Sequence, residues 1–164
     1  MRKLLYLSCL PVLMLWASCK KELPDYGNTA TVKMSNGWWV NLYEAGNLVT
    51  AKPIFFDTYN TAGNNDSLWL DDLTNGYGFK CKVKIDYNAM TFSGASLPND
   101  YFDGTPAFPA TVTINNGKVL AGAGHSRKGN VTDSLYMEAV FSDDPGETWK
   151  ITGTARTGIK DDDY

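Results

Sequence analysis

The segment Gly124-His125-Ser126-Arg127-Lys128-Gly129 is the part of this sequence that comes nearest to a hydrolytic nucleophile. A nucleophile elbow has a glycine two residues after the serine, because the backbone there passes through a strained turn from strand to helix, and here Lys128 holds that position. His125 is the one histidine of the chain and is adjacent to Ser126, so no separate histidine is left to act as a base. The sequence therefore predicts a loop serine, and an enzyme is the minor alternative.

Two pairs of adjacent acids, Asp71-Asp72 and Asp143-Asp144, are the other candidates for hydrolysis, because glycosidases need two carboxyl groups. Adjacent residues of a strand face opposite ways, so the members of one pair would not flank the same bond. The second pair also begins the turn-forming string Asp143-Asp144-Pro145-Gly146. We predict no catalytic residues.

Metal and nucleic-acid chemistry find little support in the composition. A single histidine and few cysteines cannot form a zinc site unless carboxylates supply most of the ligands. The strings Asn64-Asn65-Asp66 and Asp161-Asp162-Asp163 lack the spacing of a calcium loop. The net charge of −3, without a basic block, argues against a nucleic-acid partner. We predict no metal and no cofactor.

The start of the chain has the pattern of a bacterial lipoprotein signal. Arg2 and Lys3 precede an apolar run that ends at Trp16-Ala17-Ser18, and Cys19 follows at the position where a diacylglycerol thioether is attached. The apolar run is shorter than the roughly twenty residues that span a bilayer, which argues against a transmembrane anchor. We expect residues 1–18 to be a signal peptide. The exported lipoprotein would sit at the outer membrane, on the periplasmic face or the cell surface.

Removal of the signal would take away Cys9, and lipidation would use Cys19, which leaves Cys81 as the one free thiol. No disulfide can then close within the domain. Cys81 lies between Lys80 and Lys82 in an alternating segment, so we expect an inert, buried cysteine.

Most of the remaining chain alternates between apolar and polar residues, as half-buried strands do. The turn-forming strings Asn75-Gly76, Asn116-Gly117 and 143–146 are each expected to join two strands. About eight strands without helix signals indicate an all-β, antiparallel, closed or nearly closed up-and-down barrel, with a two-sheet β-sandwich as the alternative. We expect a lipidated N-terminus and tether over 19–35, the barrel over 36–160 and an acidic tail over 161–164. The expected strands cover 38–42, 51–58, 68–70, 79–87, 89–94, 110–114, 118–121, 134–142 and 148–157.

Short strings that follow one another along the chain support a family assignment. They cover residues 56–62, 66–72, 79–86, 91–93, 116–120, 133–136, 141–146 and 153–158. In order and spacing these strings resemble the bacterial lipoproteins named lipid-binding putative hydrolases. The resemblance implies a lipocalin-like barrel on a lipoprotein, and it carries over no catalytic residue.

The string Gly37-Trp38-Trp39 is similar to the Gly-x-Trp opening of lipocalins, in which a late arginine covers the tryptophan. Arg156 is the candidate for that arginine. In a regular strand Trp149 and Arg156 face opposite sides, so this role of Arg156 requires a bulge at Gly153.

Aromatic residues supply the best material for a binding site, since a barrel of this size can hold one small apolar ligand. The first hypothesis is a lipoprotein whose barrel lumen binds a hydrophobic or amphipathic molecule such as palmitate. Strand alternation gives the lumen candidates Trp38, Phe56, Phe79, Val83, Met137 and Trp149.

Three other functions remain open. A glycan-capture module would use Trp69, Tyr77 and Tyr101 as stacking surfaces. A lipid-ester hydrolase and a structural accessory subunit are further alternatives, and the oligomeric state is not predicted. Ser67 and Ser134, each in an Asp-Ser-Leu triplet, resemble O-glycosylation sites.

Overall fold

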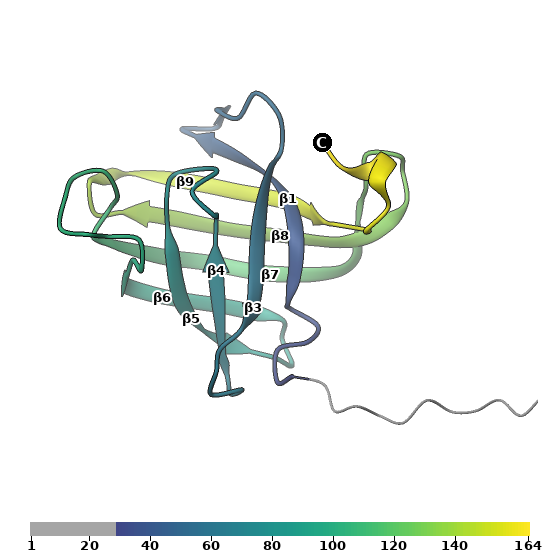
Figure 1. The fold of residues 1–164 in the computed structure, drawn as a ribbon, viewed down its shortest axis with the longest axis horizontal. Coiled ribbons are helices and arrows are strands. Elements are labelled where there is room, and N and C mark those ends of the chain that lie inside the picture. The colour runs from purple at the N-terminus through teal and green to yellow at the C-terminus, as the bar shows by residue number, and fades with distance from the viewer. Residues whose placement is uncertain (1–28) are drawn as a thin grey trace, which may run out of the picture.

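The computed structural model describes residues 29–164, so the expected signal peptide and Cys19 lie outside the described residues. The described chain is one antiparallel sheet in the order β2-β1-β3-β4-β5-β6-β7-β8-β9, and β1 also pairs with β9. This last pairing closes an eight-stranded barrel, in which β3, β4 and β5 cross in front of β7, β8 and β9 (Figure 1). The strands are β1 (Asn36–Glu44), β2 (Asn47–Leu48), β3 (Ile54–Asn60), β4 (Ser67–Asp71), β5 (Lys80–Asp86), β6 (Thr91–Pro98), β7 (Thr111–His125), β8 (Val131–Phe141) and β9 (Asp144–Ala155).

The closed sheet buries one apolar core, as the alternation predicts. In β5, Cys81, Val83 and Ile85 are buried, whereas the lysines between them are not. Burial raises the pKa of the Cys81 thiol to about 12, so the free cysteine is an inert core residue. The all-β barrel is confirmed, and the sandwich alternative is wrong because β1 and β9 pair directly. Residues 29–164 therefore contain a complete sheet and its core.

The predicted hairpin turn at Asn116-Gly117 is wrong. Both residues lie inside the long strand β7, where the register against β8 shifts between Asn115 and Lys118. Asn116 has φ 53°, a conformation that asparagine tolerates, so this turn-forming pair makes a bulge instead of a reversal. The predicted strands 110–114 and 118–121 are therefore one element.

The residues that precede β1 pack against the barrel. Met34 is completely buried, and its carbonyl oxygen accepts a hydrogen bond of 2.6 Å from the hydroxyl of Thr58. The same hydroxyl accepts a hydrogen bond of 2.8 Å from the indole nitrogen of Trp38. Residues 29–35, which the sequence suggested as the end of a tether, therefore cover one end of the barrel.

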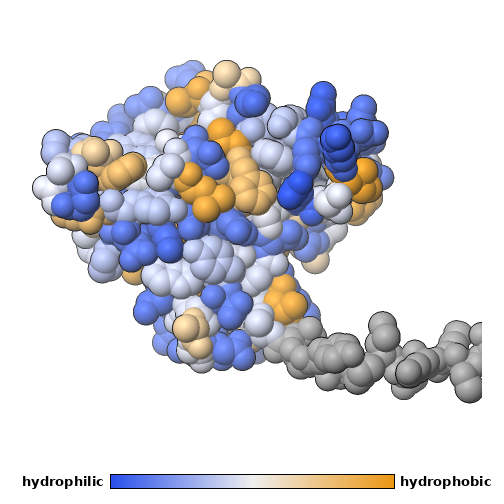
Figure 2. Space-filling view, viewed as in Figure 1, coloured by the Kyte–Doolittle hydropathy of each residue, from blue (hydrophilic) through white to orange (hydrophobic). Residues whose placement is uncertain are grey.

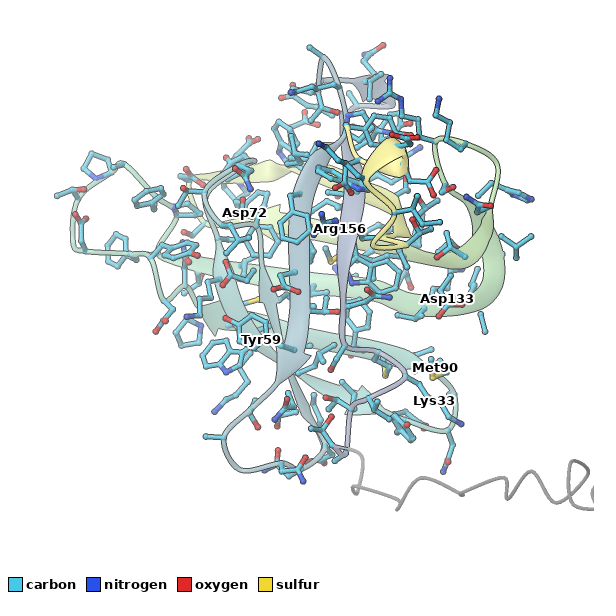
Figure 3. The ribbon with its side chains drawn as sticks, turned by 45° about the vertical axis from the view of Figure 1, so that its right-hand side comes forward. Lys33, Tyr59, Asp72, Met90, Asp133 and Arg156 are labelled. Atoms are coloured by element: carbon cyan, nitrogen blue, oxygen red, sulfur yellow. The ribbon has the colours of Figure 1, made fainter. Side chains whose placement is uncertain are left out.

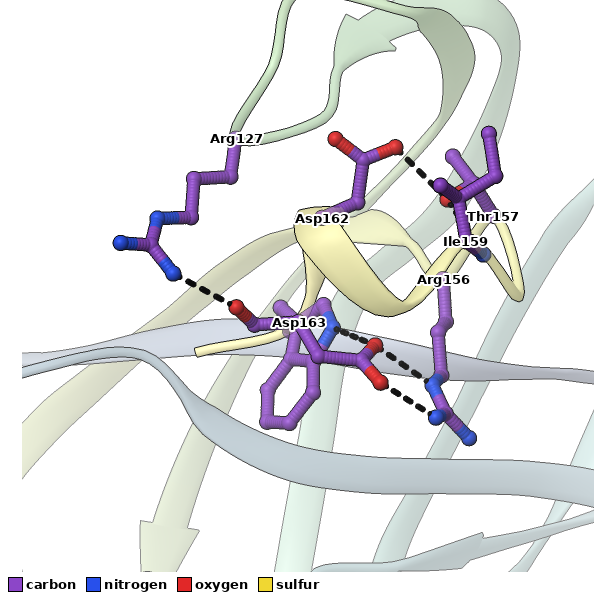
Figure 4. Close-up of polar contacts among 7 residues, drawn as sticks. Arg127, Arg156, Thr157, Ile159, Asp162 and Asp163 are labelled. Atoms are coloured by element: carbon purple, nitrogen blue, oxygen red, sulfur yellow. Dashed lines mark hydrogen bonds and ion pairs between the residues drawn. The ribbon is translucent and has the colours of Figure 1, made fainter.

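The acidic C-terminal residues fold back onto the barrel as well. A 3₁₀ helix over Lys160–Asp162 holds Asp162 at 2% exposure, where it accepts hydrogen bonds from Asn130, Thr157 and the backbone of Lys128. Asp163 pairs with Arg156 (Figure 4). Asp162 and Asp163 each have specific partners, whereas Asp161 is exposed, so two of the three acids anchor residues 160–163, which we call the clasp.

This clasp is expected to open in acid. Although burial alone would raise it, hydrogen bonds from Asn130, Thr157 and Lys128 lower the pKa of Asp162 to about 2. A carboxyl group with a lowered folded-state pKa stabilises the fold above its ordinary pKa of about 3.8, and the contribution is lost as the pH falls through the folded value. The Lys128 amide resonance should therefore shift as the pH falls below about 3, with its midpoint near pH 2.

Asp162→Asn is the matched variant, because it keeps the shape of the side chain and removes its titration. We expect its Lys128 amide resonance to stay constant over this pH range. A titration that is the same in both proteins would contradict the assignment to Asp162.

Candidate functional site

All six predicted lumen residues lie in the barrel interior. Their exposed fractions do not exceed 9%, and each belongs to the single core cluster. The strands position them by alternation, and the interior of the described barrel is accordingly apolar. Ligand contact by these residues stays a prediction. The six residues are Trp38, Phe56, Phe79, Val83, Met137 and Trp149.

Aromatic rings gather at one end of this interior. Tyr77 stacks on Phe141 with ring centroids 3.6 Å apart and meets Trp149 edge-on at 5.0 Å. Phe79 lies 5.4 Å from Phe141 and 5.8 Å from Phe56. We call these five residues the ring cluster. It joins the β4–β5 loop, the β8–β9 hairpin and the interior face of β3.

Asp72, labelled in Figure 3, shapes the loop that carries Tyr77. Its carboxylate is 2% exposed and accepts hydrogen bonds from the backbone amides of Thr74, Gly78 and Phe79, at 2.9, 2.6 and 3.1 Å. Burial raises the pKa of Asp72, although these three amides oppose the shift. Sequence reasoning considered Asp72 only as a catalytic acid, whereas its position ahead of Asn75-Gly76 suits a loop organiser.

Tyr77, which belongs to this loop, lies at one end of the barrel against Phe141 and Trp149 and closes that end. Its side chain is only partly buried, and its hydroxyl donates a hydrogen bond of 3.2 Å to Asp143 in the β8–β9 turn. Burial, followed by the charge of Asp143, raises the pKa of Tyr77 to about 12, so this donor is retained at neutral pH. Sequence reasoning placed Tyr77 among glycan-stacking residues and missed this closing contact.

A polar cluster lies on the outer face of β3 and β4. Asp57 and Asp71 are directly opposite in the strand register, and Asp71 accepts hydrogen bonds from the hydroxyls of Tyr59 and Tyr101. Burial raises the pKa of Asp57, and the charge of Asp71 adds to the shift. Tyr59, one of the two tyrosines that donate to Asp71, is labelled in Figure 3. Through Tyr101, this cluster fastens the β6–β7 loop to the barrel wall.

The remaining candidates do not converge. Trp69 lies beneath the ammonium group of Lys80, and Tyr101 contacts Asp71, whereas Tyr77 is at the barrel end, so these three rings make no common platform. The hydroxyl oxygen of Ser126 accepts a hydrogen bond from the backbone amide of Asn130 in a tight turn, as expected for a loop serine. Ser67 and Ser134 are partly exposed, and their modification stays a prediction.

The expected contact between Arg156 and the tryptophan of the Gly-x-Trp string is replaced by another arrangement. Trp38 points into the core, while Trp39, the tryptophan of the Gly-x-Trp pattern, is partly exposed and donates a hydrogen bond to Asp163. Arg156 follows the end of β9, pairs with Asp163 and lies over the ring of Phe55. Arg156 therefore covers Phe55 on the outside of the barrel.

Within residues 29–164, no three His, Cys, Asp or Glu side chains are grouped as metal ligands. The same residues contain no helix long and apolar enough to cross a membrane. The face shown in Figure 2 is largely hydrophilic, with small and separate hydrophobic patches.

A closed antiparallel barrel with an apolar interior places the protein in the lipocalin-like class of β-barrels. The family model described as lipid-binding putative hydrolase matches residues 23–160, and the chain belongs to this family. No curated protein matches the sequence. The family assignment from the short strings is thereby confirmed, and the family and the barrel together support lipid binding.

Proposed function

We propose that this protein is an exported lipoprotein that binds a fatty acyl chain, or a similar amphipathic molecule, inside its barrel. The lipid attached to Cys19 would hold it at the outer membrane, near such ligands. The observation that carries the proposal is the apolar interior, with the ring cluster at one end. An acyl chain needs apolar surface and few polar groups, which this interior supplies.

The end of the barrel closed by Tyr77 is the proposed way in. The interior is filled by side chains, so an acyl chain requires rings to move, and Tyr77 is the partly exposed member of the stack. Its hydrogen bond to Asp143 is exposed and thus costs little to break. Displacement of Tyr77 from Phe141 would open a path along Phe79 toward Met137.

The proposal is tested by native mass spectrometry of residues 20–164, which contain the whole closed barrel, before and after organic extraction. A bound lipid mass that extraction removes is the expected result. A bare chain, together with no rise in melting temperature on addition of palmitate, would contradict it, because a ligand of the folded state must stabilise it.

Tyr77→Ala should release palmitate about tenfold faster than the unchanged protein, because the ring that closes the barrel is gone. Stopped-flow displacement of a fluorescent fatty acid measures this rate. Tyr43→Ala is the matched control, since Tyr43 is also a partly exposed ring but lies on the outer face of β1 under Lys150. Equal release rates in the two variants would argue against access past Tyr77.

The membrane anchor is tested separately with Cys19→Ser in cells that process lipoproteins. We expect the variant to leave the membrane fraction while the folded barrel is retained, because the acyl anchor can no longer be attached. A variant that remains in the membrane fraction as strongly as the unchanged protein would contradict anchoring through Cys19.

A further inference from the structure

Two hollows on the outside of the barrel meet at Lys118 and Tyr136, which line both, and together we call them the outer groove. The first hollow has a volume of about 880 Å³ and crosses β5 to β8. The second, of about 460 Å³, crosses β7, β8, β9 and β1. Adjacent strands are about 4.8 Å apart, so five such steps give a groove of about 24 Å along the curved sheet. A ligand that contacts both hollows must follow the curvature of the barrel wall.

The outer groove lies on the opposite face of the sheet from the apolar interior. In its first half, Ile85 and Phe92 are buried in the core, whereas the neighbouring Lys84, Asp86 and Ser93 are exposed. The groove is therefore polar where the interior is apolar. A ligand bound there would be independent of the proposed lipid.

The β7 bulge organises the floor of the groove. The register shift carries the Asn116 side chain toward β8, where it donates a hydrogen bond of 2.7 Å to Glu138. Gly117 is required at this point, because a Cβ atom there would lie 2.3 Å from the Phe92 ring. The bulge therefore turns Asn116 toward the groove, whereas an uninterrupted strand would point other side chains outward.

The polar side chains of the floor hold one another in place. Each carboxylate oxygen of Glu138 has its own donor, since the Tyr136 hydroxyl reaches the second oxygen at 2.7 Å. The hydrogen bond from Tyr136, followed by that from Asn116, lowers the pKa of Glu138. Lys118 places its ammonium group 5.0 Å from the centre of the Tyr136 ring. Side chains ordered in this way lose little further freedom when they bind a ligand.

The charges along the first hollow balance. Two lysines, Lys84 and Lys118, face two acids, Asp86 and Glu138, so a strongly anionic or cationic ligand gains no net attraction. The groove therefore favours a ligand that is polar but uncharged.

The second hollow adds hydroxyl groups and rings. Ser134, Thr152 and Thr154 line it together with Asn41 and the ring of Trp39. Hydroxyls and amides both donate and accept hydrogen bonds, and aromatic rings provide apolar faces. This combination matches a molecule with many hydroxyl groups and apolar C–H faces.

We propose that the outer groove binds a neutral oligosaccharide chain. Tyr136 and Trp39 contact the C–H faces of sugar rings, and Lys118 moves aside from Tyr136 when the sugar arrives. Asn116 and Glu138 bind sugar hydroxyls at the bulge. The ligand lies across the strands, from β5 toward β1.

Isothermal titration of residues 20–164 with cellohexaose, xylohexaose, maltohexaose and mannohexaose tests this proposal, with hexagalacturonate as the charged probe. At least one neutral hexasaccharide should bind with a Kd of about 100 µM. Tyr136→Ala should weaken that binding at least tenfold. Binding of none of the four, or of hexagalacturonate alone, would overturn the proposal.

Two variants separate recognition from folding. Tyr43→Ala is matched to Tyr136→Ala, because both rings lie on the outer face beneath a lysine, and Tyr43 does not line either hollow. Glu138→Gln keeps the side-chain shape and should weaken sugar binding about threefold or more. An equal loss in Tyr43→Ala, or unchanged binding in Glu138→Gln, would overturn the proposal. Palmitate binding should be unchanged in both groove variants, which distinguishes this outcome from failure of the lipid proposal.

Discussion

Phe79→Ala should reduce the free energy of unfolding by about 3–5 kcal/mol, the range typical of a buried phenylalanine truncated in a core. Phe79 is 1% exposed and lies between Phe56 and Phe141 in the ring cluster. Its removal takes away apolar burial and leaves a cavity, because rings fixed on three different segments cannot collapse around it. Urea unfolding followed by circular dichroism measures the loss.

Phe102→Ala is the control for this prediction, because Phe102 is 42% exposed in the β6–β7 loop. Its effect should be no more than about 0.5 kcal/mol. The new cavity in Phe79→Ala also enlarges the proposed lipid site, so saturating palmitate should restore part of the lost stability. A Phe79→Ala protein as stable as Phe102→Ala would show that the ring cluster is not part of the packed core.

Gly153→Ala should destabilise the barrel by about 3 kcal/mol, near the upper end of the usual cost of overpacking. Gly153 lies on β9 opposite Val40 of β1, at the pairing that closes the barrel. A Cβ atom at this position would come within 2.3 Å of the carbonyl oxygen of Trp39. Because that neighbour is backbone, relief requires β1 and β9 to separate locally. Chemical unfolding measures the loss, and amide exchange along β1 should increase.

Gly146→Ala is the matched control on the same strand. Gly146 has no atom within 4 Å of the added Cβ position and lies at the β8–β9 end, away from the closing pairing. Its stability should change by no more than about 0.5 kcal/mol. Equal stabilities of the two alanine variants would contradict the claim that Gly153 permits the close approach of β1 and β9.

The strand content and the inward residues could be predicted because burial on one face leaves a period of two in the sequence. Phe79, Cys81, Val83 and Ile85 follow this period, and all four are buried. The closed barrel was a less direct prediction, since closure depends on the pairing of β1 with β9, which are distant in sequence. Turn-forming residues alone did not distinguish a reversal from a bulge at Asn116-Gly117.

The features missed by sequence reasoning depend on contacts between distant segments. Asp162 and Asp163 appear as solvated acids until their partners Asn130 and Arg156 are brought beside them. Tyr77 appears as an exposed ring until the β8–β9 turn supplies Phe141 and Asp143. Local composition carries no record of such partners, so neither the clasp nor the closing ring could be predicted.

The central claim, that a lipid binds inside the barrel, is tested most directly by methyl NMR of residues 20–164 with ¹³C-labelled methionine. Met34 and Met137 are completely buried in the core, whereas Met90 lies in the β5–β6 turn and is partly exposed. Titration with palmitate should shift the Met137 resonance in a saturable manner and leave that of Met90 unchanged. A shift confined to Met90, or no shift of Met137 at saturating palmitate, would contradict binding in the interior.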